Sequence, residues 1–516
     1  MDRAVVSAGQ PRPLDLHRSS APPGPVDHVG VVDIGSNSVR LVVYDRLARA
    51  PLPRFNEKSM SRLGEGIDGN GGTIPAPAFA RLIDTMGRFR AIADSMGVAR
   101  VDVLGTEAIR SANNGPALIE AIRAATGFEV RVLSGEEEAR FAGLGVVAGF
   151  YRPTGMVGDM GGGSVEIIEV VDDSVGDRHV SLPLGALPVT AMLLDDAKLA
   201  KAHVDELLRD RLPPMLASDA VFYAVGGGWR ALANAHMAAV AAPVHVVHGY
   251  AIDGDDARAF AKELRRMPAD EVQALPGIPS RRASTLQAAA LVLERLLKRL
   301  RPDRVVFSAL GLREGWLYSQ LDEAERYRDA LVEGARELGQ AVARVPDFGA
   351  ALVRWTDELF PGETDADRRL RVAACALSDV AWRDHPDLRA LESFRRVLQF
   401  PFVGIEHRER VFLAAAVHAR YRGNGDGPEL EPVLALLTPS ERRRAQILGR
   451  MMLLGHRLSA SVPAILDSAE LVIEAEQLRL VVREAARIPD GEAVQGRLDL
   501  LAKAIGVRKT VIETAG

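Results

Sequence analysis

An internal repeat constrains the fold of this chain more than any other feature of its sequence. Residues 33–42 read DIGSNSVRLV and residues 159–168 read DMGGGSVEII, so Asp, Gly, Ser and Val recur at the same offsets. Each segment follows a short apolar run and leads into another, which is the pattern of a strand, a tight polar turn and a second strand. The repeat therefore predicts two similar lobes whose turns face each other across a cleft.

The residues of these two turns favour phosphate binding. Small residues let backbone amides approach a ligand closely, and a serine hydroxyl adds another donor. The candidate phosphate ligands are Gly35, Ser36, Asn37 and Ser38 in the first turn and Gly161, Gly162, Gly163 and Ser164 in the second. Asp33 and Asp159, which precede the turns, can hold a hydrated Mg²⁺ or position a water. One such turn alone is equally compatible with a plain hairpin loop, but two matching turns favour a site.

Strand and helix patterns alternate around the turns. Helical patterns cover residues 78–96 and begin near Pro116, and strand patterns cover residues 101–104 and 128–133. This alternation predicts an α/β sheet in each lobe. A third glycine cluster follows an apolar strand at residues 220–225 and opens a helix, so the amides of Gly227 and Gly228 are candidates for a further phosphate or a nucleotide.

Composition limits the expected partners and compartment. The formal net charge is -5 and aromatic residues make up 5 %, which gives no sign of a DNA-binding surface or of base-stacking platforms. The sequence contains no uncharged apolar stretch long enough to predict a membrane span. The single cysteine, Cys375, excludes an intramolecular disulfide framework and fits a reducing cytoplasm. Residues 1–28 are rich in proline and are expected to form a disordered leader.

Five further strings carry a resemblance to a known family. They are GTEAIR at residues 105–110, LSGEEEAR at 133–140, SLPLGA at 181–186, HGY at 248–250 and SALGLREG at 308–315. Together with the two turns they resemble the exopolyphosphatase and guanosine pentaphosphatase (Ppx/GppA) family, within the superfamily of acetate and sugar kinases, heat-shock chaperones and actin. The resemblance covers roughly residues 29–320 and implies two actin-like (ribonuclease H-like) lobes with a cleft between them.

The resemblance places a catalytic base on Glu138. A carboxylate within reach of an in-line water can orient that water and take its proton. Glu137 stays open as an alternative base, because Glu136, Glu137 and Glu138 are adjacent and three acids also begin a helix favourably.

The resemblance further implies a divalent metal, Mg²⁺ or Mn²⁺, held by Asp159 and Glu166 with Asp33. Arg40 occupies the position in the first repeat that Glu166 occupies in the second, so one side is expected to handle metal and the other bare phosphate. An ion pair between Arg40 and Glu166 is the alternative. Thr106 and Arg110 lie one helical turn apart, and both are candidate phosphate ligands.

Beyond about residue 321 the pattern is mainly helical. Long members of the family carry a domain here that resembles metal-dependent HD phosphohydrolases, but Ser378 replaces the expected histidine, while Asp379 and His418 remain. We therefore expect a degenerate HD-like domain without a metal site. The predicted divisions are a leader at 1–28, lobe I at 29–140 with the return of a helix near 309–322, lobe II at 141–308, the HD-like domain at 323–460 and a small α/β unit at 461–516.

Another departure from the family lies at residues 282–284, where Arg-Ala-Ser replaces a common Arg-Ala-Asp. Basic clusters at residues 442–444 and 298–304 are candidates for an extended polyanion track, although such runs are usually solvated helix faces.

The leading functional hypothesis is an exopolyphosphatase that removes terminal phosphate from inorganic polyphosphate, acting as a homodimer. The alternatives are conversion of guanosine pentaphosphate to the tetraphosphate, a related kinase, and a non-catalytic sensor of polyphosphate or of a guanosine alarmone.

Overall fold

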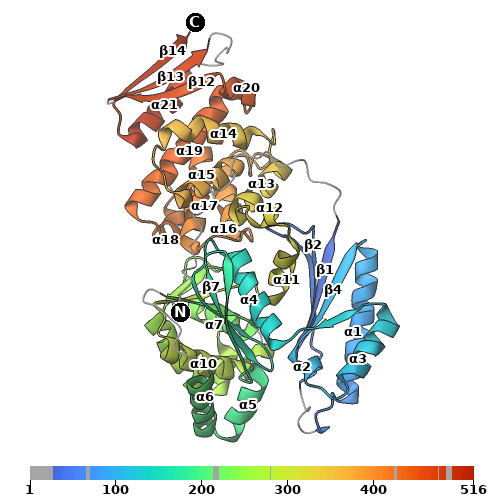
Figure 1. Ribbon diagram of the computed structural model, residues 1–516. Helices are drawn as coiled ribbons and strands as arrows, with labels where there is room; N and C mark the ends of the chain where they lie inside the picture. The colour runs from blue at the N-terminus through green and yellow to red at the C-terminus, as the bar shows by residue number, and fades with distance from the viewer. Residues whose placement is uncertain are drawn as a thin grey trace, which may run out of the picture.

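The computed structural model describes residues 27–64, 70–212, 220–278, 280–422, 427–474, 476–483 and 491–515. The predicted leader at residues 1–28 lies almost entirely outside them. Two α/β lobes stand side by side at one end of the molecule, and a helical region with a small sheet forms the other end (Figure 1).

The first lobe is built on a five-stranded sheet with the order β3-β2-β1-β4-β5. Its strands are β1 (Val29–Ile34), β2 (Val39–Tyr44), β3 (Pro53–Ser59), β4 (Arg100–Gly105) and β5 (Val130–Val132). β1 pairs antiparallel with β2 and parallel with β4. Helices α1 (Ala76–Ser95) and α3 (Gly115–Thr126) bury apolar side chains such as Leu82 and Ile122 against one face of the sheet.

The second lobe repeats this path. Its six-stranded sheet has the order β10-β11-β9-β6-β7-β8, formed by β6 (Gly155–Met160), β7 (Val165–Val171), β8 (Ser174–Leu182), β9 (Val221–Val225), β10 (Tyr250–Asp253) and β11 (Arg304–Phe307). The run β8-β7-β6-β9-β11 matches β3-β2-β1-β4-β5 in order and in strand direction. The internal repeat is therefore a structural repeat, as predicted.

Six helices cover the second sheet, and one of them, α10, is the longest in this lobe. They are α5 (Ala186–Asp195), α6 (Ala197–Arg211), α7 (Gly227–Ala239), α8 (Gly254–Arg266), α9 (Ala269–Ala274) and α10 (Ser280–Leu300). Within α10 a run of fully buried residues that includes Leu291 and Leu296 packs against the sheet, together with the buried indole of Trp229 on α7.

Two helices lie between the sheets and join the lobes. α4 (Gly135–Gly149) covers the inner face of the second sheet, and α11 (Leu312–Gln320) covers the inner face of the first. They cross at glycines: a Cβ atom at Gly315 would lie 1.7 Å from the carbonyl oxygen of Phe141, and one at Gly145 would lie 2.3 Å from that of Gly311. Glycine thus lets the two backbones touch, which fixes how the lobes approach each other.

The remaining chain forms a helical region with its own apolar core. Its longer helices are α13 (Ala330–Val342), α14 (Phe348–Thr356), α15 (Asp365–Ala376), α16 (Arg389–Gln399), α17 (His407–Arg422) and α19 (Pro439–Ser459). Thr438 caps α19 by accepting the amide of Glu441, which confirms the helix start that Thr, Pro and Glu indicate there. Within the described part of the chain no helix is both long and apolar enough to cross a lipid bilayer.

A small sheet of three strands, with one helix between its second and third strands, ends the described chain, in the region where a small α/β unit was predicted. β12 (Ala469–Glu474) and β13 (Gln477–Arg483) pair antiparallel, and β14 (Lys509–Ala515) lies parallel to β13 after helix α21 (Gly491–Ile505). The predicted domain boundaries stay a prediction.

We expect Gly315→Ala to lower the temperature of the unfolding transition of the two lobes by about 6 °C or more, because the new methyl group forces α11 off α4 at a cost of about 3 kcal/mol. Differential scanning calorimetry measures this. The matched control is Gly87→Ala in α1, where a Cβ atom meets nothing within 4 Å. Equal stability of the two variants would contradict the proposed role of the helix crossing.

Candidate active site

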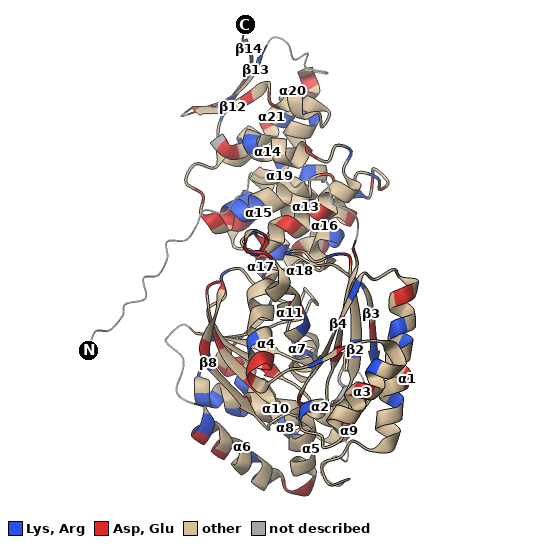
Figure 2. Ribbon diagram, turned by 45° about the vertical axis from the view of Figure 1, so that its right-hand side comes forward, with Lys and Arg blue, Asp and Glu red and all other residues tan. Residues whose placement is uncertain are grey.

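A cavity of about 180 Å³ lies between the lobes, where both turns end. Most of the residues that the sequence predicted for the site line it: Asp33, Gly35, Ser36, Asn37, Ser38, Arg40, Thr106, Glu138, Asp159, Gly161, Gly162, Gly163, Ser164, Glu166, Gly227 and Gly228. Glu137 and Arg110 are the predicted residues that do not line it. Figure 2 shows the acidic start of α4 between the two lobes.

In both turns, backbone carbonyl oxygens accept hydrogen bonds from amides of neighbouring segments. In the first turn the carbonyl oxygens of Ser36 and Asn37 accept the amides of Gly64 and Arg62, at 2.8 and 3.1 Å. In the second turn the amides of residues 185–187 donate to the carbonyl oxygens of Gly163, Gly161 and Gly162, at 2.8 to 3.1 Å. Carbonyl oxygens would repel a phosphate, so tying them back leaves turn amides for an anion. This contact explains the SLPLGA string, because a Cβ atom at Gly185 would lie 2.3 Å from Gly163.

The two turns also touch each other across the cavity. A Cβ atom at Gly162 would lie 2.9 Å from the Cβ of Ser36, and one at Gly163 would lie 2.2 Å from a carboxylate oxygen of Glu107. Ser36 Oγ donates to the same carboxylate at 3.2 Å. The close approach of the two turns therefore requires glycine at residues 162 and 163 of the second turn.

Glu138 lies in the first turn of α4 with its side chain buried. Ser134 caps this helix, and the side chain of Glu137 closes the capping box by accepting the Ser134 amide at 3.0 Å. Successive helical residues point in different directions, so Glu137 faces away from the cavity toward Arg131 while Glu138 faces into it. The geometry thus favours Glu138 over Glu137 as the candidate base.

Arg110 contacts this candidate base rather than the cavity. Its guanidinium donates to Glu138 Oε1 and to the carbonyl oxygen of Leu133. Burial raises the pKa of Glu138 above the usual glutamate range, the Arg110 pairing lowers it, and the charges of Asp33 and Asp159 raise it again. Arg110 is accordingly placed to orient a carboxylate that holds its proton at higher pH than an exposed glutamate does.

Asp159 and Glu166 form the carboxylate side of the cavity on β6 and β7, directly opposite each other in the strand register. Burial raises the pKa of Asp159 to about 6, against an opposing effect of Arg230. Burial also raises the pKa of Glu166, and the nearby charge of Glu138 adds to this shift. Glu166 accepts a hydrogen bond from Ser181 Oγ at 3.0 Å. Two buried carboxylates, Glu138 and Glu166, and the half-buried Asp159 thus lie in one cavity, where a cation would lower the cost of their negative charges.

Arg40 and Thr106 have specific contacts on the first lobe. Arg40 Nε donates to Asn56 Oδ1 at 2.7 Å, so the structure does not pair Arg40 with Glu166 as the alternative interpretation required. Thr106 Oγ1 donates to the carbonyl oxygen of Ile34 at 3.1 Å. The Thr106 hydroxyl thus fixes the end of β1 beside the first turn.

Two half-buried arginines, which sequence reasoning did not assign to the site, line the cavity. Arg313 Nη1 donates to Asp33 Oδ2 at 2.8 Å, and its Nε is buried without a hydrogen-bond partner. Arg230, at the start of α7, donates to the carbonyl oxygen of Ser308 at 3.3 Å. Arg313 belongs to the SALGLREG string, so the signal was present, although its partner Asp33 is 280 positions away.

The neighbouring Glu314 holds this corner in place. Its carboxylate accepts the hydroxyl of Tyr44 at 2.7 Å and the amide of Gly311 at 3.0 Å.

The carboxylates fit a hydrated divalent cation better than a closed protein cage. Within the described residues no three His, Cys, Asp or Glu side chains come close enough to hold a metal ion by themselves. Asp33 forms an ion pair with Arg313, so Asp159 and Glu166 are the better candidates for metal ligands. Mg²⁺ and Mn²⁺ suit such a site, because one or two carboxylates, waters and phosphate oxygens satisfy Mg²⁺.

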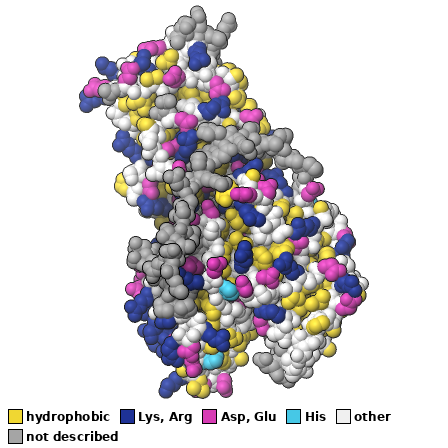
Figure 3. Space-filling view, viewed as in Figure 1, with side chains coloured by type: hydrophobic (Ala, Val, Ile, Leu, Met, Phe, Trp, Pro, Cys, Tyr) yellow, Lys and Arg dark blue, Asp and Glu magenta, His cyan; other side chains and the backbone are white. Residues whose placement is uncertain are grey.

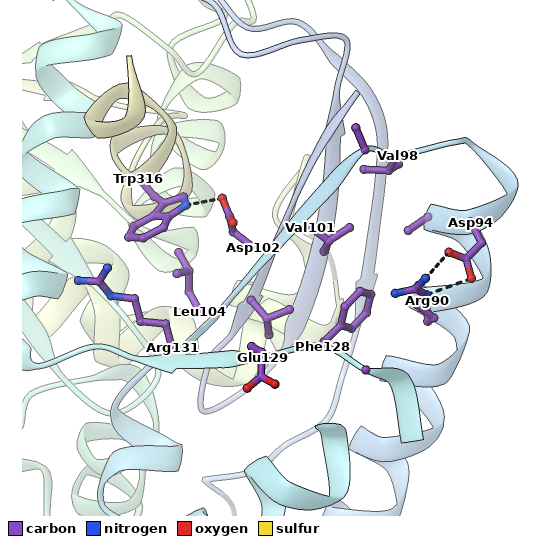
Figure 4. A pocket seen from close by; sticks show the side chains of 14 residues that line it. Arg90, Asp94, Val98, Val101, Asp102, Leu104, Phe128, Glu129, Arg131 and Trp316 are labelled. Atoms are coloured by element: carbon purple, nitrogen blue, oxygen red, sulfur yellow. Dashed lines mark hydrogen bonds and ion pairs between the residues drawn. The ribbon is translucent and has the colours of Figure 1, made fainter. Parts of the chain in front are cut away.

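A second and larger cavity, of about 400 Å³, lies on the outer edge of the first lobe (Figure 4). Four of the charged side chains there contact neighbours: Arg90 pairs with Asp94, Asp102 accepts from the indole of Trp316, and Arg131 pairs with Glu137. It has neither a phosphate turn nor a group of buried carboxylates, so the chemistry of the first cavity makes it the better candidate for an active site despite its smaller volume.

Basic residues surround Asp379, the aspartate that the sequence analysis compared with the HD motif. It lies just after α15, which ends at Ala376. Its carboxylate accepts from Arg344 at 2.8 Å and from Arg420 at 3.1 Å. His456 hydrogen-bonds Ser378 at 3.0 Å, and burial lowers its pKa well below the usual range. Two guanidinium groups thus surround Asp379.

The basic cluster at residues 442–444 is largely neutralised. Arg442 pairs with Glu431 at 2.8 Å, Arg444 pairs with Asp367, and Arg443 donates to carbonyl oxygens at the end of α21. Basic and acidic side chains are interspersed over the helical region in Figure 3. These contacts weaken the hypothesis of a polyanion track there.

Comparison with known proteins gives two family matches. The Ppx/GppA phosphatase family matches residues 42–324, and the family described as exopolyphosphatase, C-terminal, matches residues 331–512. The chain is 33 % identical over 319 residues to Exopolyphosphatase 1 of Mycobacterium leprae, which covers 59 % of this chain and 92 % of that protein.

Two further comparisons extend this picture. A crystal structure of an exopolyphosphatase from Cytophaga hutchinsonii matches with a TM-score of 0.50 and 26 % identity, covering 57 % of this chain and 97 % of that one. A guanosine-5'-triphosphate,3'-diphosphate pyrophosphatase of Aliivibrio fischeri is 25 % identical over 304 residues, or 57 % of this chain and 59 % of that protein. The predicted fold class, two actin-like lobes followed by a mainly helical region, is confirmed.

The raised pKa of Glu166 implies that the stability of the fold depends on pH. A carboxyl group whose pKa is higher in the folded state than its ordinary value of 4.5 stabilises the fold at low pH and loses that contribution as pH rises through the raised pKa. We therefore expect Glu166→Gln to gain a few degrees in unfolding temperature relative to the parent between about pH 5 and pH 8. Added Mg²⁺ should stabilise the parent more than the variant at the higher pH.

The control for this measurement is Glu169→Gln, which alters a carboxylate on the same strand outside the cavity. Its unfolding temperature should follow that of the parent at every pH. If the difference in unfolding temperature between the parent and Glu166→Gln does not change with pH, the raised pKa of Glu166 is contradicted.

Proposed function

The chain belongs to the Ppx/GppA phosphatase family, and from that premise we propose that it is an exopolyphosphatase that releases terminal phosphate from inorganic polyphosphate. The observation that carries the proposal is the position of Glu138. It is buried and lines the same cavity as the two turns, whose carbonyl oxygens are hydrogen-bonded to neighbouring amides. In this proposal the end of a linear chain of phosphoryl groups occupies the cavity beside the turn amides, and a water beside Glu138 attacks it.

The proposed reaction is hydrolysis of the terminal phosphoanhydride bond. Glu138 accepts a proton from the attacking water as the water oxygen bonds to the terminal phosphorus. The bond from that phosphorus to the bridging oxygen breaks, and its electron pair leaves with the shortened chain. Arg110 keeps the Glu138 carboxylate oriented, while turn amides, with the Arg40 and Arg313 guanidinium groups, hold the charged phosphate oxygens.

A divalent cation completes this proposal. Asp159 and Glu166, with Asp33 beside Arg313, are the residues that would hold Mg²⁺ or Mn²⁺, which would neutralise charge on the phosphate oxygens. The raised pKa values of Asp159 and Glu166 support this, because a cation in the cavity would relieve the repulsion between the carboxylates.

Guanosine pentaphosphate is the second candidate substrate, because a relative with a pyrophosphatase name matches the chain and uses the same bond type. A guanine base would gain most from an aromatic surface on which to stack. No aromatic side chain lines the cavity within the described residues. This favours the polymer over the nucleotide, and the clustered carboxylates favour an enzyme over a passive sensor.

The remaining parts of the proposal come from the sequence. A cytoplasmic site of action fits the single cysteine, which is buried on α15. The helical region offers surfaces through which two copies could form the predicted homodimer.

We expect Glu138→Gln to lower the rate of phosphate release from long-chain polyphosphate by a factor of about 10² to 10⁴, because the amide cannot take a proton. Phosphate release with Mg²⁺ measures this, with guanosine pentaphosphate as the competing substrate. The matched control is Glu137→Gln, which keeps a capping-box side chain and should keep most of the activity. Equal losses of activity in both variants would contradict the assignment of Glu138 as the base. Faster turnover of guanosine pentaphosphate than of polyphosphate would contradict the proposed substrate.

A further inference from the structure

The structural repeat includes an arginine that follows the same strand in each lobe. β4 runs parallel to β1 in the first lobe, as β9 runs parallel to β6 in the second. Arg110 lies in the short helix α2 (Glu107–Arg110) after β4, and Arg230 lies in the first turn of α7 after β9. The two arginines therefore occupy comparable places, one in each lobe.

The contacts of these two arginines differ. Arg110 donates to the carboxylate of Glu138. Arg230 donates through Nη1 to the carbonyl oxygen of Ser308 at 3.3 Å, and among the described residues its guanidinium forms no other hydrogen bond and no ion pair. A guanidinium has five N–H donors. Because the Arg230 side chain also lines the cavity, most of these donors are available to a ligand there.

The strand order places Arg230 away from the candidate base. β6 lies between β7 and β9 in the second sheet, so Glu166 on β7 and Arg230 after β9 lie on opposite sides of Asp159. Glu166 is on the side of the candidate base, because the charge of Glu138 acts on it. Arg230 therefore lies toward the other end of the cavity.

The first lobe shows the same division. β1 lies between β2 and β4, so Arg40 on β2 and Arg110 after β4 lie on opposite sides of Asp33. Arg110 is the residue that binds Glu138, which leaves Arg40 at the end of the cavity away from this carboxylate. The cavity thus has one end with the candidate base and another end to which Arg40 and Arg230 both belong.

Arg40, Arg230 and Arg313 form an arginine cluster, and all three line the cavity. Burial lowers the pKa of Arg230 to about 10, and the charges of Arg313 and Arg40 add to this shift. The charges of Asp159 and Glu314 oppose it. Loss of solvation and repulsion between the arginines therefore both act against the charged form of Arg230. A phosphate group between the guanidinium groups would offset both effects and accept hydrogen bonds from them.

The proposed reaction needs positive charge at this end of the cavity. In phosphoryl transfer the attacking and leaving oxygens lie roughly in line, on opposite sides of the phosphorus. The attacking water is proposed beside Glu138, so the leaving oxygen points toward the opposite end, where the arginine cluster lies. Negative charge grows on that oxygen as the bond breaks, and fixed donors beside it lower the energy of the transition state.

We infer that Arg230 is a further substrate-binding residue, which together with Arg40 and Arg313 binds the second phosphoryl group of the chain. The inference rests on the proposed function and adds a direction to it: the terminal group lies beside Glu138, and the second group lies at the arginine cluster. When the bond from the terminal phosphorus to the bridging oxygen breaks, the electron pair stays on that oxygen, and Arg230 stabilises the resulting charge. Arg230 keeps its proton throughout. Its ligand is a linear chain of two or more phosphoryl groups.

The first test is the rate of phosphate release by Arg230→Gln with Mg²⁺. We expect kcat/KM to fall by a factor of about 10² to 10³ for long-chain polyphosphate and by a similar factor for tripolyphosphate, because both carry a second phosphoryl group. Arg230→Lys, which keeps the charge but not the planar fork, should lie between the parent and Arg230→Gln. The control is Arg258→Gln, which alters an exposed arginine on α8 outside the cavity and should match the parent.

Binding without turnover is measured in the Glu138→Gln protein, as the rise in unfolding temperature that tripolyphosphate and Mg²⁺ cause. Adding Arg230→Gln should reduce this rise, because affinity falls about tenfold or more when a charge-assisted hydrogen bond is lost. Adding Arg258→Gln should leave the rise unchanged. Each protein is compared with itself, which separates ligand binding from any change in the stability of the unliganded fold.

An unchanged rise in unfolding temperature with Arg230→Gln, or a loss of activity confined to long-chain polyphosphate, would overturn the inference and leave the proposed function standing. If the parent releases no phosphate from either substrate, the proposed function fails. A reduced rise with Arg230→Gln in that case would still support the contact with a phosphate chain.

Discussion

The clustering of carboxylates in one cavity is the constraint on which the rest of the site depends. Glu138, Asp159 and Glu166 line this cavity, and burial is the largest cause that raises the pKa of each. Neighbouring carboxylates add to these shifts: the charge of Asp33 acts on Glu138 and Asp159, and the charge of Glu138 acts on Glu166. Such an arrangement costs stability and persists because the surrounding structure enforces it. The glycine crossing of α4 and α11 brings the two sheets together, and the tied-back turns complete the walls. A cation and a phosphate chain would relieve the conflict together.

The two lobes share one order and direction of strands, and they differ in the side chains that face the cavity. At equivalent register positions the first lobe has Arg40 and the second has Glu166. A duplicated strand–turn–strand unit therefore supplies two candidate phosphate turns, and a single exchange on the strand after each turn gives the two lobes side chains of opposite charge. In the proposed function this difference would give a linear substrate an orientation, which a symmetric cleft would lack.

Much of this could be predicted from the sequence because its signals are local. The repeat predicts the paired turns, and the three adjacent glutamates indicate the start of α4, which Ser134 caps in the structure. Glu137 and Glu138 could be told apart only when the helix showed which side chain faces the cavity. The contacts of Asp33 with Arg313 and of Tyr44 with Glu314 join segments about 270 to 280 positions apart, and nothing local encodes them.

The central claim is that the end of a phosphate chain lies between the two turns beside Glu138. A crystal structure of the Glu138→Gln protein with long-chain polyphosphate and Mg²⁺ tests it most directly. The account predicts the terminal phosphoryl group between residues 35–38 and 161–164, with the chain running over Arg40. A polymer bound to the helical region, with the cavity between the lobes occupied by water, would contradict it.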